Sequence, residues 1–465
     1  MKKTLLLSIA ASAVLFAGGE IVPPSEPCPI AEPCVEASKS ALNWYGQTVL
    51  YYQTSELGDA ATNNELFDGD QSAANLGLKL GVTGANLAGS GLGFGLEVIA
   101  LGSAGLEKDG DAFVDGTSGV DGGTTLNGHG TPDGKINDFV DDTMQKTSGG
   151  INGGELTQAY LTYAIANTTV KVGRMELPKN VSPFAFSESW NVFKNTFEAA
   201  LVVNAGDVPD TTLVGAWVMR ANAIGNLGDW SDMGVNDNGV FMLTAINRSV
   251  AGLALTGTMY YAPEMANLEE DAIIFWGDAK FSTKVAGATV NVAAQGGMID
   301  LDLDDPSIAY GVKAGGKYDI PAIGNVALCV AYTGVDLQDV DNAPIKNLAT
   351  GVKTPLYTQM IANQNAISGA TSKMGTADTI MVKGSGTYDI PALGTTTLIA
   401  QYSTTEREAG IDGSATISDY NELDVIAKAK IKGAVVLAAY VHQENDDDND
   451  ATDNDIVRVW AKWNF

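Results

Sequence analysis

The sequence predicts an all-β fold: a transmembrane antiparallel β-barrel of about 18 strands with short periplasmic turns and long extracellular loops. Three features support this prediction. They are an N-terminal export signal, an alternation of apolar and polar residues from residue 41 to the C-terminus, and connections of two alternating lengths. A hydrophobic content of 45% without a second long apolar run indicates strands rather than transmembrane helices.

The N-terminus has the composition of a secretory signal peptide. Lys2 and Lys3 precede an apolar run over residues 5–17, and cleavage after Gly19 places small residues at both positions that signal peptidase reads. We therefore expect three parts: a signal peptide (1–19), a Pro- and Cys-containing periplasmic segment (20–40) and a transmembrane β-barrel domain (41–465).

Two cysteines, Cys28 and Cys34, bracket a proline-rich stretch directly after the signal. In the oxidising periplasm this pair is expected to form a small local disulfide. The alternative is a pair of unpaired, exposed thiols. Cys329 lies in a predicted strand and is expected to be inert.

From residue 41 onward the chain has the period-two pattern of strands. In residues 76–82 the even positions are apolar and the odd ones are small or charged, and residues 312–321 recur closely at 382–391 as a repeated hairpin. A soluble all-β protein would pack its inward faces as a core, but many inward positions here carry Lys, Asp, Gln or Gly. Expected turns lie at 167–168, 249–252, 286–287, 321–324 and 391–394, and long loops at 57–72, 105–153, 178–194, 222–237, 338–376, 406–419 and 444–455.

The last strand places Val457, Val459, Ala461, Trp463 and Phe465 on one face, with Phe465 as the final residue. A closing strand that ends in an aromatic residue resembles the signal read by the outer-membrane assembly machinery. We therefore expect Phe465 to be recognised by that machinery.

Composition excludes several classes of function. With 56 acidic against 27 basic residues, a net charge of −29 argues against nucleic-acid binding and favours cationic solutes or divalent metals. The two histidines, His129 and His442, do not predict a catalytic triad or a zinc site. No enzyme activity and no required cofactor are expected.

The predicted lumen is lined by lysines, which the alternation places on the inward faces of the strands. Opposite acidic loops, such a row would create a transverse field that sorts ions by charge. The alternative is that the lysines only solvate the wall. The lysine row comprises Lys79, Lys280, Lys313, Lys383, Lys428, Lys430 and Lys462.

Residues 178–194 are the best candidate for a loop that folds into the barrel, because four aromatic residues make this segment too apolar for a loop in water. Glu176 and Glu198 flank it and Glu188 lies within it. We expect Glu176 and Glu188 to line the pore. Contact with a neighbouring subunit is the alternative role of this loop.

An acidic cluster in the loop at 105–153, formed by Asp109, Asp111 and Asp115, is a candidate Ca²⁺ site because Ca²⁺ prefers oxygen ligands. The alternative is an acidic rim that is only solvated.

Three runs, QAYLTY at 158–163, VGRMEL at 172–177 and NTFEA at 195–199, resemble the major outer-membrane porins of campylobacter-type (epsilon) proteobacteria and related specific porins. Met175 and Ala199 depart from the expected Gln and Gly. The resemblance, clearest over residues 155–219, implies a homotrimeric barrel in the outer membrane of a Gram-negative bacterium, with a preference for cations and with calcium in some members.

The expected function is passive diffusion of small hydrophilic solutes and ions, with cations preferred. A substrate-specific channel, for instance for basic amino acids, is the nearest alternative, followed by a surface adhesin or structural barrel with an occluded lumen and by an outer-membrane hydrolase. Alternation also places Arg174 and Glu176 on the lipid face, so we expect either a β-bulge or a subunit interface there.

Overall fold

The computed structural model describes residues 42–57, 65–67, 72–104, 153–189, 192–222, 230–233, 238–263, 271–301, 306–321, 323–337, 343–362, 364–368, 374–391, 393–409, 419–445 and 453–465. The predicted signal peptide and N-terminal segment, with Cys28 and Cys34, lie outside these residues. So do Asp109, Asp111 and Asp115. No helix within the described ranges is long and apolar enough to cross a bilayer.

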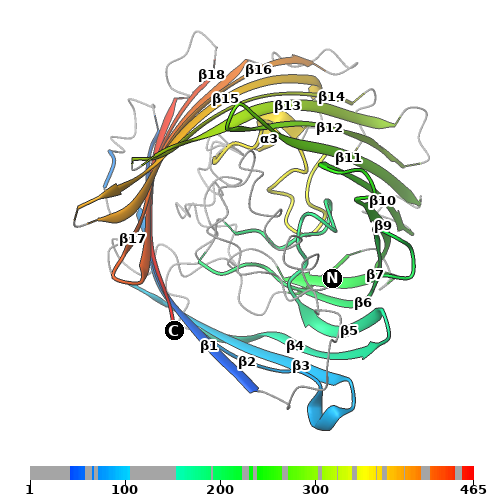
Figure 1. Ribbon diagram of the computed structural model, residues 1–465. Coiled ribbons are helices and arrows are strands. Elements are labelled where there is room, and N and C mark those ends of the chain that lie inside the picture. Colours follow the sequence, from blue (N-terminus) through cyan, green and yellow to red (C-terminus); the bar gives the residue numbers. More distant parts are fainter. Residues whose placement is uncertain are drawn as a thin grey trace, which may run out of the picture.

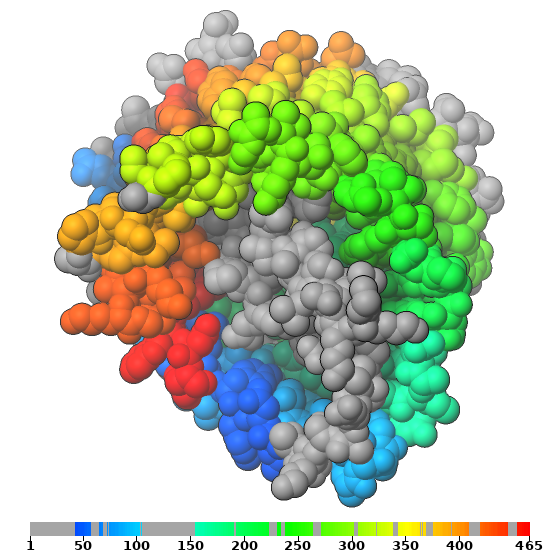
Figure 2. All heavy atoms as spheres, viewed as in Figure 1, coloured from blue at the N-terminus to red at the C-terminus, as the bar shows by residue number. Residues whose placement is uncertain are grey.

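One antiparallel sheet closes on itself through the pairing of β1 with β19 (Figures 1 and 2). Because β8 is a three-residue strand in the connection from β7 to β9, the other 18 of the 19 strands form the wall. This confirms the predicted fold class, and closure removes the exposed edges of an open sheet. The strands are β1 (Leu42–Leu57), β2 (Ser72–Gly84), β3 (Leu92–Ser103), β4 (Gly153–Ile165), β5 (Thr168–Met175), β6 (Phe197–Ala205), β7 (Thr211–Asn222), β8 (Trp230–Asp232), β9 (Val240–Asn247), β10 (Leu253–Ala262), β11 (Ala272–Val285), β12 (Ala288–Asp300), β13 (Ser307–Ile320), β14 (Gly324–Asp336), β15 (Met374–Ile390), β16 (Gly394–Ala409), β17 (Tyr420–Ile431), β18 (Ala434–Asn445) and β19 (Asn454–Asn464).

Connections alternate in length, as the sequence predicts. The wall strands β4 and β5, β11 and β12, and β17 and β18 are each joined by two residues, whereas β3 and β4 are separated by residues 104–152. A short 3₁₀ helix, η2 (Leu87–Gly89), joins β2 to β3 at the short-turn end, and a helix of one turn, α3 (Asn365–Ser368), precedes β15. The two-residue turns thus lie at one end of the barrel and the longest connections at the other.

The outer surface of the barrel exposes many large apolar residues. On β2, Leu76, Leu78 and Leu80 are 53%, 41% and 45% exposed, while the intervening Gly77 and Lys79 point inward. Exposed leucines at this period form the band that a barrel turns towards lipid.

The chain ends by closing the barrel. The backbone N–H of Phe465 donates to the carbonyl oxygen of Gly46 at 2.9 Å, and the N–H of Gly46 donates to the carbonyl oxygen of Phe465 at 2.8 Å. A Cβ at position 46 would overlap the ring of Phe465, so the absence of a side chain there makes room for the terminal aromatic.

The interior is partly filled by two long connections, which we call the first inward loop (residues 176–196) and the second inward loop (residues 337–373). Their described parts lie inside the ring of strands (Figure 1). Buried apolar residues of both loops pack against inward residues of the wall in two clusters. One extends over β5–β15 and includes Tyr420 of β17, and the other lies on the β16–β3 side. The open lumen is therefore narrower than an empty barrel of this strand number.

Candidate functional site

The structure places every member of the lysine row on the inward face. They lie on β2, β11, β13, β15, β17 and β19, so every second strand from β11 to β2 contributes one and β17 contributes two. Neutral residues lie between them on the intervening strands: Ala293, for example, pairs with both Lys280 and Lys313. Because adjacent strands lie about 4.8 Å apart, the backbones of Lys280 and Lys313, which share one register, are separated by about 10 Å.

The lysines of this row differ in their surroundings. The Lys280 ammonium lies 3.0 Å from an oxygen of Asp278, and that of Lys313 lies 4.4 Å from the ring centroid of Tyr357. Lys428, in contrast, is half-buried and Lys430 is exposed, with no ion pair to another described residue. Within the part of the chain that the structure describes, these two lysines of β17 therefore have no carboxylate partner, although β17 also carries Glu422 and Asp424 on its inward face.

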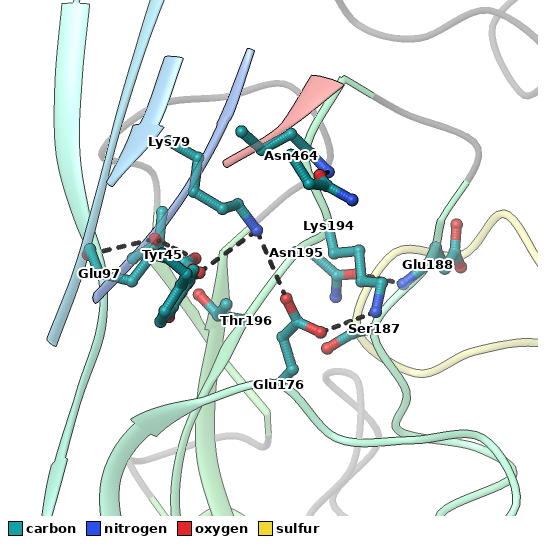
Figure 3. Close-up of polar contacts among 12 residues, drawn as sticks. Tyr45, Lys79, Glu97, Glu176, Ser187, Glu188, Lys194, Asn195, Thr196 and Asn464 are labelled. Atoms are coloured by element: carbon teal, nitrogen blue, oxygen red, sulfur yellow. Dashed lines mark hydrogen bonds and ion pairs between the residues drawn. The ribbon is translucent and has the colours of Figure 1, made fainter. Parts of the chain in front are cut away.

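A network of charges joins the first inward loop to β2 and β3 (Figure 3). The ammonium of Lys79 lies 3.3 Å from Glu97 and 3.8 Å from Glu176, and Glu176 also accepts a 2.8 Å hydrogen bond from Lys194. Tyr45 donates to Glu97 at 3.0 Å. This network fixes opposite charges across a short distance at one side of the lumen.

Glu176 lies just beyond the end of β5. Burial disfavours its ionised form, but the ammonium groups of Lys194 and Lys79 outweigh this effect and lower the pKa of Glu176 below its ordinary value. Its carboxylate is therefore a fixed negative charge facing the lumen at neutral pH.

Arg174 does not share the orientation of Glu176. It alternates with the buried Met175 and pairs in register with Glu198, whose carboxylate accepts from Arg174 Nε at 2.8 Å. Next to this pair on the outer face lies Arg220, which pairs in register with Glu198 and contacts Asp232 at 2.8 Å. These four charged residues form the outer-face row. No register shift occurs between β4 and β5; the strand ends at Met175, which lets Glu176 turn inward.

The first inward loop is anchored by aromatic packing and polar contacts to the wall. The ring of Phe184 lies edge-on to Tyr260 and Trp276, with centroids 5.9 and 5.4 Å away. Thr244 donates to the carbonyl oxygen of Val181 at 2.7 Å. Phe184, one of the four aromatic residues from which the sequence predicted an inward loop, thus packs on the wall at β10 and β11.

The second inward loop is anchored on other strands. Tyr357 donates to Asp278 on β11 at 2.8 Å, and the backbone N–H groups of Ile361 and Ala362 donate to Glu422 on β17 at 2.7 and 3.0 Å. Gln401 on β16 donates to the carbonyl oxygen of Gln359 at 2.7 Å. The described part of this loop therefore reaches from β11 to β17.

Glu188 lies between the two inward loops rather than on the open lumen surface, with only 1% of its side chain exposed. Its Oε1 accepts from Asn347 Nδ2 at 2.8 Å, from the backbone N–H of Lys353 at 3.1 Å and from the hydroxyl of Thr350. Glu188 therefore does not line the pore, as the sequence led us to expect; it connects the two loops.

Sequence reasoning did not find several of these residues. Asp278 lies two positions from Lys280 on the same inward face, so the alternation that identified the lysine could have identified it. Tyr357 and Glu422 offered no such signal, because their roles depend on how the second inward loop folds. No group of three or more metal-ligating side chains occurs within the described ranges.

No protein-family model and no curated protein matches the chain. Solved structures with a similar fold include several proteins of Pseudomonas aeruginosa. OccK9 (OpdG) is 15% identical with a TM-score of 0.64, covering 92% of this chain and 98% of that chain. OccD3 (OpdP) is 11% identical with a TM-score of 0.63, covering 91% of each chain. OpdK, solved with vanillate, is 12% identical with a TM-score of 0.63, covering 91% and 98%. At these identities the likeness shows the fold alone, a closed antiparallel β-barrel that this chain shares with the three proteins.

Proposed function

We propose that this chain is a channel of the outer membrane of a Gram-negative bacterium, through which small hydrophilic solutes and ions diffuse passively. The observation that carries the proposal is a row of inward lysines along the wall beside two loops that narrow the lumen. A water-filled path with fixed charges at its narrow part admits polar solutes and discriminates between them by charge and size.

Two sets of charges act on a permeating ion in this proposal. The surplus of acidic residues, a net −29 over the chain, attracts cations to the channel and supports a cation preference. The lysine row opposes that preference locally, at the wall. The balance of the two sets the ion selectivity.

A substrate-specific channel for carboxylate-bearing solutes is the second candidate. Lys428 and Lys430 of β17, which have no ion pair to another described residue, favour it, because ammonium groups at a narrow neck can bind a carboxylate. Vanillate, the compound in the OpdK structure, is such a carboxylate. This candidate predicts that a carboxylate solute blocks ion current at low concentration, whereas a general channel shows no block.

Further parts of the proposal concern assembly and ancestry. The outer-face row from Arg174 to Asp232 is a polar surface where lipid would be expected, which supports association as a homotrimer that covers it. The terminal Phe465, bonded to β1, supports recognition by the outer-membrane assembly machinery. The motifs within residues 155–219 support kinship with campylobacter-type porins.

Single-channel recording in planar bilayers tests the main proposal. Purified, folded protein should insert and give steady current steps in KCl. Insertion without conductance would contradict the proposal and would favour a structural barrel or adhesin.

A further inference from the structure

The two inward loops leave the wall on nearly opposite sides of the barrel. The first follows β5 and the second follows β14, and the closed strand order separates these positions by almost half the ring. Each loop is anchored to the wall near its own path, as described above. Their mutual contact inside the lumen therefore decides whether the constriction is one body or two independent segments.

Glu188 occupies the centre of that contact. All three donors to its Oε1, from Asn347, Thr350 and Lys353, belong to the second inward loop. One oxygen of the first loop thus gathers three donors from a stretch of seven residues, 347–353, of the second.

The carboxyl group is also held in place from its own side. The backbone N–H of Glu188 donates to Asn195 Oδ1 at 2.7 Å, which ties the two arms of the first loop together. Asn347 Nδ2 makes a second bond, to the carbonyl oxygen of Phe186 at 2.9 Å. We call these contacts of Glu188 with Asn347, Thr350 and Lys353 the joint. It is held in place within both loops, and the side chain of Glu188 is almost completely buried.

We propose that Glu188 is the positioning residue that joins the two inward loops into one rigid constriction and thereby sets the width of the channel without touching solute. This inference rests on the proposed channel function. Other contacts between the loops, such as Lys179 to the carbonyl oxygen of Thr354 at 2.6 Å and Leu348 to that of Phe184 at 2.7 Å, do not involve the carboxyl group. Loss of Glu188 should therefore loosen the constriction and leave the barrel wall intact.

The joint requires an acceptor oxygen more than a negative charge. Burial raises the pKa of Glu188 above its ordinary value, which shows that these surroundings disfavour the ionised form despite the three donors. Glutamine retains a carbonyl oxygen at the same place, whereas alanine removes the acceptor that all three donors share. Glu188→Gln and Glu188→Ala therefore separate the role of the oxygen from that of the charge.

The experiment compares wild type, Glu188→Gln, Glu188→Ala and the control Glu444→Ala, whose carboxylate is exposed at the end of β18. Single-channel recordings report conductance and open-channel noise, and liposome swelling reports the largest neutral sugar that permeates. We expect Glu188→Ala to lose the single steady level, to show several noisy levels and to admit larger sugars. Glu188→Gln and Glu444→Ala should behave as wild type.

A double-mutant cycle with Asn347→Ala tests the joint itself. Each single variant should give the noisy phenotype, and the double variant should be no worse than Glu188→Ala, because both changes remove the same connection. A steady, wild-type current in Glu188→Ala would overturn the inference, and so would fully additive effects in the cycle.

Proteolysis of the folded barrel in detergent keeps the inference testable apart from conductance. The inward loops of Glu188→Ala should be cleaved faster than those of wild type, with heat-modifiable mobility unchanged, and equal cleavage rates would contradict the inference. If wild type conducts no current but this difference in cleavage persists, the channel proposal fails while the structural joint stands. If Glu188→Ala does not assemble, Asn347→Ala and Thr350→Val decide the same question from the other loop.

Discussion

Replacing part of the lysine row with glutamine should raise the preference of the channel for cations. The perturbation is the triple variant Lys280→Gln, Lys313→Gln and Lys428→Gln, which removes positive charge from β11, β13 and β17 without shortening the side chains greatly. Removal of the charge at position 280 also deprives Asp278 of the ammonium group that lies 3.0 Å away, which acts in the same direction; the hydrogen bond from Tyr357 to Asp278 remains.

The size of the effect follows from Coulomb's law with screening by salt. An ion that passes about 10 Å from one lysine feels about 0.4 kcal/mol in a water-like dielectric, and screening at 0.1 M salt reduces this to about 0.15 kcal/mol. Three lysines give about 0.45 kcal/mol, with opposite sign for cations and anions. The cation-to-anion permeability ratio should therefore change by about 0.9 kcal/mol, or roughly fourfold.

The assay is the reversal potential of bilayers under a salt gradient, first near 0.1 M and then near 1 M. Lys432→Gln, in the turn between β17 and β18, is the matched control and should leave the potential unchanged. At 1 M the Debye length falls to about 3 Å and the effect should disappear. An unchanged potential at low salt would show that the lysines do not border the ion path; a shift that persists at 1 M would show that simple screening is the wrong description. From the sequence, neutralising Asp109, Asp111 and Asp115 should have the opposite effect.

The remaining predictions concern assembly, association and pH. Deleting Phe465 removes both backbone hydrogen bonds to Gly46 and should lower the yield of heat-modifiable barrel; Gly46→Leu should do the same by displacing the ring, and normal yields in both would refute the role of this contact. The charge reversal Arg174→Glu places a second carboxylate beside Glu198 on the outer face and should reduce the amount of cross-linked trimer. The double variant Arg174→Glu, Glu198→Arg should restore the trimer. Cross-linking of the wild type that yields only monomer in detergent would contradict a subunit interface at this face. Because the pKa of Glu188 is raised in the folded protein, the contact between the two inward loops should be most stable below the ordinary glutamate pKa. It should weaken as pH rises through the raised pKa. Open-channel noise should therefore increase over that pH range in wild type and stay constant in Glu188→Gln.

The alternation of residues was sufficient to predict the wall of the barrel. A period of two assigns each strand residue to lipid or lumen with no knowledge of its neighbours, because adjacent side chains of a strand point in opposite directions. Leu78 and Lys79 were assigned in this way, and the structure has Leu78 exposed and Lys79 turned inward. The turns and the closing strand were equally accessible, since Gly, Pro and Asn at the turns and an aromatic terminus are local signals.

The constriction could be predicted only in part. The apolar composition of residues 178–194 indicated a loop that leaves the water, and Phe184 indeed packs on the wall. The alternation of strand residues could not be used for Glu188, because this residue lies in irregular backbone. There, an odd or even position does not tell which way a side chain points. Its placement between the loops depends on residues more than 150 positions away in the chain.

The sequence by itself determined the barrel, the inward orientation of its lysines and the positions of its short turns, because each follows from short-range pattern and backbone geometry. Only the tertiary structure decided that Glu176 turns inward while Arg174 stays outside, because that depends on where β5 ends. It also decided that the second inward loop shares the lumen with the first. The physical reason is that loop segments gain their positions from contacts with distant strands, as Tyr357 does with Asp278, and such contacts leave no period in the sequence.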